Sequence, residues 1–276
     1  MVVAMLLLTA PAVSAQTDSL EVDTGMVARA EQLIGLKFTP SERDSMLDEL
    51  QSNLDGYRAL RGVTLENSVP PALTFSPLLP GMTVDTVQRP LRFSPLGTVK
   101  RPKHLDDLAF YTVRQLAELI RTRQVTSTEL TQLCLKRMKK YDSDLHCVIT
   151  LTEDLALRQA ARADSEIAAG HYRGPLHGIP YGAKDLLATR GYPTTWGAMP
   201  YKDQVINTDA TVIRKLQEAG AVLVAKLTLG ALAWGDVWFG DTTRNPWNLQ
   251  QGSSGSSAGP AAAVAAGLVP FAIGSE

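Results

Sequence analysis

A run of serine and glycine that leads directly into an apolar, alanine-rich stretch constrains the fold of this chain most. Residues 251–260 read Gln-Gly-Ser-Ser-Gly-Ser-Ser-Ala-Gly-Pro, and residues 261–274 are largely apolar. Pro260 suits the first turn of a helix, and Gly267 suits its end. A flexible linker of similar composition would be flanked by polar residues or a domain boundary. The pattern therefore favours a structured loop packed onto a buried helix of small residues.

A loop of this kind can hold hydroxyl and backbone N–H groups around a reacting carbonyl. Residues 255–259 also match the Gly-x-Ser-x-Gly pattern of α/β-hydrolases, in which Ser257 would be the nucleophile. That pattern requires an apolar strand directly before the serine, and the preceding residues here are polar. It also requires an acidic residue and then a histidine later in the chain, and only Glu276 follows. The match by itself is weak support for such a hydrolase.

A lysine closes a short apolar segment 72 positions before Ser256. Residues 179–183 predict a buried strand, and Lys184 and Asp185 stand at its end. Burial destabilises an ammonium group, so a lysine in this place can be neutral and act as a base. Asp185 would oppose this if it pointed the same way, and we expect its carboxylate to turn away and hold backbone. The alternative for an isolated Lys-Asp pair is a solvated surface position.

Four segments, in this order and spacing, resemble the amidase signature family over about residues 105–276. They are His177–Asp185, Asp209–Lys226, Asn245–Trp247, and Gly255–Gly259 with the alanine-rich stretch behind it. The resemblance implies an α/β fold with a central mixed sheet flanked by helices. It also implies a hydrolase that cleaves the C–N bond of a small-molecule carboxylic amide. The residues themselves imply no metal and no cofactor.

The resemblance further implies a Ser–cis-Ser–Lys triad. In such a triad one serine attacks the amide carbonyl, and a second serine, which follows a cis peptide bond, passes the proton to a neutral lysine. Lys184 matches the lysine. The family spacing from Asn245 and Gly274 selects Ser256 as the bridging serine. The cis bond is therefore expected between Gly255 and Ser256.

The nucleophilic serine of the family and its glycine-rich oxyanion hole lie a few residues beyond Glu276. The resemblance therefore predicts a fragment of an amidase domain that is incomplete at its C-terminus and inactive alone. Two alternatives remain open. One is a component like the A subunit of a glutamine-dependent tRNA amidotransferase, which would need partner chains. The other is a non-catalytic protein with an amidase fold.

Composition describes an ordinary soluble globular protein, with 45% hydrophobic residues, 20% charged residues and a formal net charge of −1. This charge gives no basis for binding nucleic acid or an acidic membrane surface. The four histidines show no metal-ligand spacing, and His177 suits a structural hydrogen bond better than a base. Cys134 and Cys147 lie in apolar contexts that suit buried thiols as well as a disulfide.

The chain divides into three predicted parts. Residues 1–15 resemble a secretory signal peptide, with an apolar run and a small-residue cleavage site, which predicts export. Residues 16–104 are expected to form an N-terminal helical extension that ends in a Pro-rich strap. Residues 105–276 form the N-terminal part of the amidase domain, in which helices and strands alternate. The predicted strands of that part are 146–151, 179–183 and 221–225, and two of its predicted helices are 154–170 and 210–219.

Overall fold

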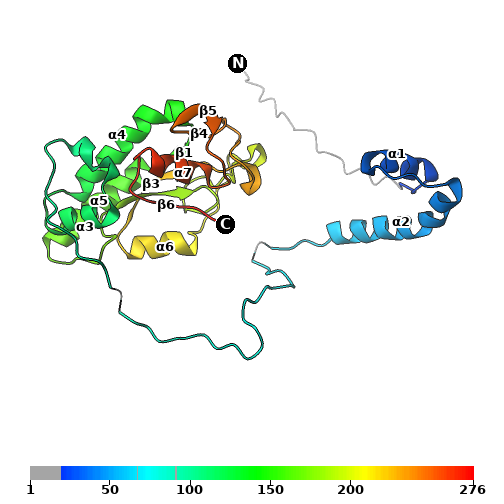
Figure 1. Ribbon diagram of the computed structural model, residues 1–276, viewed down its shortest axis with the longest axis horizontal. Helices are drawn as coiled ribbons and strands as arrows, with labels where there is room; N and C mark the ends of the chain where they lie inside the picture. The colour runs from blue at the N-terminus through cyan, green and yellow to red at the C-terminus, as the bar shows by residue number, and fades with distance from the viewer. Residues whose placement is uncertain (1–19, 67, 91) are drawn as a thin grey trace, which may run out of the picture. The chain divides into compact units, whose positions relative to one another are not determined.

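The structure is a computed structural model that describes residues 20–66, 68–90 and 92–276. The predicted signal peptide, residues 1–15, lies outside the described residues. The chain divides into two compact units, of which the first ends at Arg89 and the second begins at Pro90 (Figure 1). None of the helices in the described part of the chain has the length and hydrophobicity needed to span a bilayer.

The first unit contains a helical hairpin of α1 (Thr24–Ile34) and α2 (Pro40–Arg61). Glu31 of α1 is nearly fully buried and forms an ion pair with Arg43 of α2, with 2.6 Å between Oε1 and Nε. The hydrogen bond from Arg43 is the main cause that lowers the pKa of the Glu31 carboxyl. The hairpin is therefore joined by a charged contact between its two helices.

The second unit is built around a four-stranded mixed sheet with the strand order β1-β3-β2-β6. β3 runs antiparallel to β1 and parallel to β2, and β6 runs parallel to β2. This arrangement confirms the predicted α/β fold with a mixed central sheet. The strands are β1 (Val148–Leu151), β2 (Pro180–Lys184), β3 (Val222–Leu227) and β6 (Ala272–Ile273), and a separate ribbon pairs β4 (Arg244–Asn245) with β5 (Asn248–Gly252).

Helices cover both faces of the sheet. One hydrophobic cluster joins β3 to α4, α5 and α7, and another joins β2 and β3 to α6. Figure 1 shows α4 and α6 on opposite sides of the sheet. The α-helices of this unit are α3 (Val113–Arg121), α4 (Ser127–Leu145), α5 (Glu153–Ala168), α6 (Thr211–Glu218) and α7 (Ala258–Ala265); its 3-10 helices are η1 (Leu105–Phe110), η2 (Met199–Tyr201) and η3 (Ala231–Ala233).

The last residues of the Pro-rich strap pack against the helices of the second unit. The guanidinium of Arg114 in α3 lies 5.1 Å from the centre of the Phe93 ring and donates a hydrogen bond to the Ser94 carbonyl. Arg101 forms an ion pair with Glu129 of α4, with 2.8 Å between Nη2 and Oε1. These contacts hold the last residues of the strap, which belong to the second unit, against α3 and α4.

The two cysteines are both buried free thiols, which decides between the alternatives that the sequence left open. Cys134 lies on the buried face of α4, and Cys147 lies directly before β1. Burial raises the pKa of the Cys134 thiol to about 12. Burial likewise raises the pKa of the Cys147 thiol. Neither thiol is therefore activated as a thiolate near neutral pH.

Candidate active site

The serine-rich loop lies between β5 and α7 and closes onto the end of β2. The peptide bond between Gly255 and Ser256 is cis, as the sequence predicts. A Cβ atom on Gly255 would lie 1.9 Å from the carbonyl oxygen of Gly235, so only glycine fits there. The backbone N–H of Ser254 donates to Asp236 Oδ2 at 3.0 Å. The loop is thus held by the segment around Gly235 on one side and by α7 on the other.

Lys184 is the last residue of β2, and its side chain is fully buried. Its Nζ lies 2.8 Å from Ser256 Oγ, 3.1 Å from Ser257 Oγ and 2.9 Å from Ser275 Oγ. The structure thus brings together Lys184 and Ser256, the two site residues named from the sequence. Burial lowers the pKa of the Lys184 ammonium, and the carboxylate of Glu276 acts in the opposite direction. Burial therefore shifts the equilibrium of this group toward the neutral amine relative to an exposed lysine.

Ser275 was not recognised from the sequence as a member of this cluster. Its backbone N–H donates to Ser257 Oγ at 3.1 Å, and Ser257 Oγ in turn donates to the Ser275 carbonyl at 3.2 Å. The available signal was strand register, because β6 pairs with β2 through Ala183 and Ile273. This pairing brings the residues that follow β6 beside Lys184.

A buried ion pair lies next to the cluster and involves Asp185, the residue after Lys184. Asp185 Oδ2 accepts hydrogen bonds from the backbone N–H and the hydroxyl of Thr195, at 2.7 and 2.6 Å. The carboxylate therefore holds backbone, as expected. Its other oxygen, Oδ1, lies 2.6 Å from Lys226 Nζ, and both side chains are fully buried. The sequence pattern did not predict this partner.

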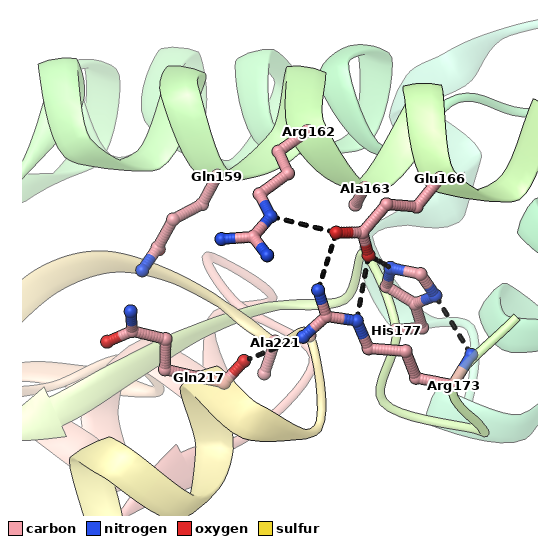
Figure 2. A pocket seen from close by; sticks show the side chains of 9 residues that line it. Gln159, Arg162, Ala163, Glu166, Arg173, His177, Gln217 and Ala221 are labelled. Atoms are coloured by element: carbon pink, nitrogen blue, oxygen red, sulfur yellow. Dashed lines mark hydrogen bonds and ion pairs between the residues drawn. The ribbon is translucent and has the colours of Figure 1, made fainter. Parts of the chain in front are cut away.

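His177 lies at the other end of β2, in a pocket with Arg162, Glu166 and Arg173 (Figure 2). The imidazole is 1% exposed. Its Nδ1 accepts a hydrogen bond from the Arg173 backbone N–H at 3.1 Å, and its Nε2 lies 3.2 Å from Glu166 Oε2. These contacts agree with the structural role assigned from the sequence. Within the described residues, no cluster of three His, Cys, Asp or Glu side chains is placed to hold a metal ion.

The buried His177 predicts that the second unit loses stability in mild acid. Desolvation is the main cause that lowers the pKa of His177 below its ordinary value of 6.5, so the folded chain binds this proton less readily than the unfolded chain. The contribution is complete above pH 6.5 and is lost as the pH falls below it. Urea unfolding at about pH 7.5 and about pH 5, on either side of the ordinary histidine pKa, measures the effect.

The matched variants for this measurement are His177→Gln and His171→Gln. Removal of the buried imidazole is expected to reduce the difference in unfolding free energy between the two pH values. His171 is exposed, and its replacement is expected to leave the difference unchanged. An equal acid sensitivity in all three proteins would contradict this assignment to His177.

The structure thus combines a mixed α/β fold with a buried lysine that contacts three serine hydroxyls. The amidase family model matches residues 129–276, and the chain belongs to the amidase family.

Relatives of two kinds share sequence with the chain. The A subunit of glutamyl-tRNA(Gln) amidotransferase from Endomicrobium trichonymphae is 37% identical over 175 residues, which cover 62% of this chain and 36% of that protein. The putative amidase AmiD of Mycobacterium tuberculosis (strain ATCC 25618 / H37Rv) is 40% identical over 178 residues, which cover 63% of this chain and 38% of that protein. The chain thus spans little more than a third of the length of these relatives.

Among solved structures, the native peptide amidase from Stenotrophomonas maltophilia is similar to this chain. It superposes with a TM-score of 0.58 and 36% sequence identity, and the match covers 62% of this chain and 37% of that one. This similarity agrees with the mixed α/β fold described above.

Proposed function

We propose that this chain is part of an amidase that hydrolyses the C–N bond of a carboxylic amide through a Ser–cis-Ser–Lys triad. In this proposal Lys184 is the base and Ser256 is the bridging serine. The observation that carries the proposal is the contact of 2.8 Å between the buried Lys184 Nζ and Ser256 Oγ.

In this proposal Lys184 is a neutral amine, which has two N–H donors and one lone pair. Three hydroxyl groups surround Nζ, so one can donate to the lone pair while the other two accept. Ser256 lies nearest to Nζ and is the hydroxyl that we assign as donor to the lone pair. Ser257 and Ser275 then accept the two N–H groups and fix the direction of the lone pair.

The proposed reaction begins with a proton relay. The attacking serine, which we place after Glu276, gives its proton to Ser256 Oγ as Ser256 gives its own proton to Lys184 Nζ. The serine oxygen forms a bond to the amide carbon, and the C–N bond breaks as the same relay returns the proton to the leaving amine. Water then hydrolyses the acyl-enzyme ester by the same route. The 276-residue chain by itself is expected to be inactive.

A fluorophosphonate probe tests the proposal, because it bonds covalently to an activated serine oxygen and releases fluoride. The protein expressed from the full reading frame is expected to be labelled at a serine beyond Glu276. The 276-residue chain is expected to remain unlabelled under the same conditions. Equal labelling of the shorter chain at Ser257 would overturn the triad and favour the Gly-x-Ser-x-Gly hydrolase.

A second candidate function is that of one chain in a tRNA amidotransferase, and the similarity to the relatives of that kind favours it. That function would use the same lysine and serines but would need partner chains. The export proposed from residues 1–15 argues against it. Cell fractionation separates the two, because an exported amidase and a component of a cytoplasmic complex would be recovered in different fractions.

A further inference from the structure

Two buried lysines, Lys184 and Lys226, lie at neighbouring positions on adjacent strands, and their side chains point to opposite faces of the sheet. β2 and β3 are parallel, with Lys184 opposite Leu227 and Ala183 opposite Lys226. Successive side chains of a strand alternate between faces. Lys184 therefore faces α7 and the serine loop, whereas Lys226 and Asp185 lie on the other face of the sheet.

The ion pair of Asp185 and Lys226 is fully buried, and further polar groups surround it. Lys226 Nζ lies 2.6 Å from Asp185 Oδ1 and donates to the Pro193 carbonyl at 3.0 Å and to Thr194 Oγ1 at 3.3 Å. Thr195 donates twice to Asp185 Oδ2. Burial of two charges is costly, and such a pair often stabilises a fold no more than apolar residues would. A contribution to stability therefore does not by itself explain why this ion pair lies close to Lys184 in the chain.

The charge of Asp185 matters because of its place in the chain. It is the residue after Lys184, and charges interact more strongly in a buried region than in water. An unpaired carboxylate there would stabilise the ammonium form of Lys184. Lys226 supplies the opposite charge at contact distance. The two opposite charges therefore offset each other on that face of the sheet.

The same pair also anchors backbone that leads to the serine loop. Asp185 holds Thr195, and the next carbonyl, that of Trp196, accepts from the Leu232 N–H at 2.9 Å. The segment that begins there contains Asp236, whose carboxylate accepts from the Ser254 N–H. A continuous path of chain and hydrogen bonds thus runs from the ion pair to the loop that carries Ser256.

We propose that the Asp185–Lys226 ion pair is a positioning element of the site, in which Lys226 cancels the charge of Asp185 so that Lys184 can remain neutral. The catalytic meaning of this inference rests on the proposed function. The other groups that face Lys184 are the hydroxyls of Ser256, Ser257 and Ser275, and the nearby charge is the carboxylate of Glu276.

The test is an NMR titration of Lys184 in the 276-residue chain labelled with ¹³C-lysine, with its signal assigned by its loss in Lys184→Met. Lys226→Met leaves Asp185 unpaired, and the titration midpoint of Lys184 is expected to move to higher pH. Asp185→Asn leaves Lys226 unpaired, and the midpoint is expected to move to lower pH. The double variant has neither charge, and its midpoint is expected to return to that of the unaltered chain.

Opposite shifts in the two single variants identify an electrostatic effect, because general damage to the fold would not reverse sign. Unchanged midpoints, or shifts in the same direction, would overturn the inference. If Lys226→Met does not fold, as judged by circular dichroism, Asp185→Asn and the double variant decide. A lowered Lys184 midpoint in Asp185→Asn, together with an unaltered midpoint in the double variant, supports the proposal. An unchanged Lys184 midpoint in Asp185→Asn contradicts it.

This titration requires no enzymatic activity, so its outcome is independent of the amidase proposal. If the Lys184 midpoint shifts in opposite directions in the two single variants but fluorophosphonate does not label the protein, the inference is supported and the proposed function is refuted. If fluorophosphonate labels a serine beyond Glu276 but the Lys184 titration midpoint is the same in all variants, the proposed function is supported and the inference about the ion pair is refuted.

Discussion

Replacement of Lys184 with methionine is expected to reduce the rate of fluorophosphonate labelling of the full reading-frame protein by about 100- to 10,000-fold, the contribution typical of a general base. Methionine keeps much of the buried volume of the lysine but lacks the amine that accepts the proton from Ser256. The second-order rate constant of labelling, measured with the purified protein, gives the size of the effect.

The pH dependence of labelling provides a further readout of the same lysine. Burial lowers the pKa of Lys184 below its ordinary value of 10.5, and the base form is present above that lowered pKa. The labelling rate is therefore expected to rise with pH through this value and then level off, and Lys184→Met is expected to lose this rise. The control is Lys215→Met, which removes an exposed lysine of α6. Unaltered labelling in Lys184→Met, with the same pH profile, would refute the assignment of the base.

Replacement of Gly259 with alanine is expected to destabilise the second unit, although Gly259 lies in a helix. Alanine is favoured over glycine within helices by roughly 0.5–1 kcal/mol. A Cβ atom at this position would, however, lie 2.4 Å from the Thr228 nitrogen and 2.6 Å from the Cys147 carbonyl oxygen. Both are backbone atoms that cannot move away by side-chain rotation, and overpacking of this kind costs about 1–3 kcal/mol. The steric cost therefore exceeds the gain in helix propensity.

Thermal unfolding followed by circular dichroism measures this effect. For a domain of about 150–250 residues, a loss of about 2 kcal/mol lowers the melting temperature by roughly 4–8 °C. Gly97→Ala is the matched control, because a Cβ at Gly97 meets open space and the residue lies in the same unit. A melting temperature of Gly259→Ala at or above that of the unaltered chain would show that α7 can move away from β1 and β3.

The sequence predicted the central elements of the second unit because their burial pattern is local. The strand predicted at 179–183 is observed at Pro180–Lys184, and the one predicted at 221–225 is observed at Val222–Leu227. The ribbon of β4 and β5 was not predicted, since its residues are polar and show no alternation. β6 was also missed, because it has only two residues and exists through its pairing with β2.

The part of the candidate site that could be predicted is the part that lies within the ordered sequence motifs. Lys184 and Ser256 were named from the sequence, and the structure places them in contact. Ser275 and Lys226 were not named as site residues, because their contacts depend on strand register. The pairing of β2 with β3 contains an irregularity between Tyr181 and Gly182, which determines the residue of β3 that lies beside Ala183. No local pattern of residues records such a shift.

The strand order has a consequence for the time course of synthesis. β2 is a central strand of the sheet, but its two neighbours, β3 and β6, follow it by roughly 40 and 90 residues of chain. At a translation rate of about 5–20 residues per second, β3 is synthesised roughly 2–8 s after β2, and β6 is synthesised roughly 5–18 s after β2. During that interval Lys184 belongs to a strand with an open edge, which is the kind of surface that favours aggregation and recruits chaperones. A residue that the finished fold buries completely is therefore among the last to be covered on the ribosome.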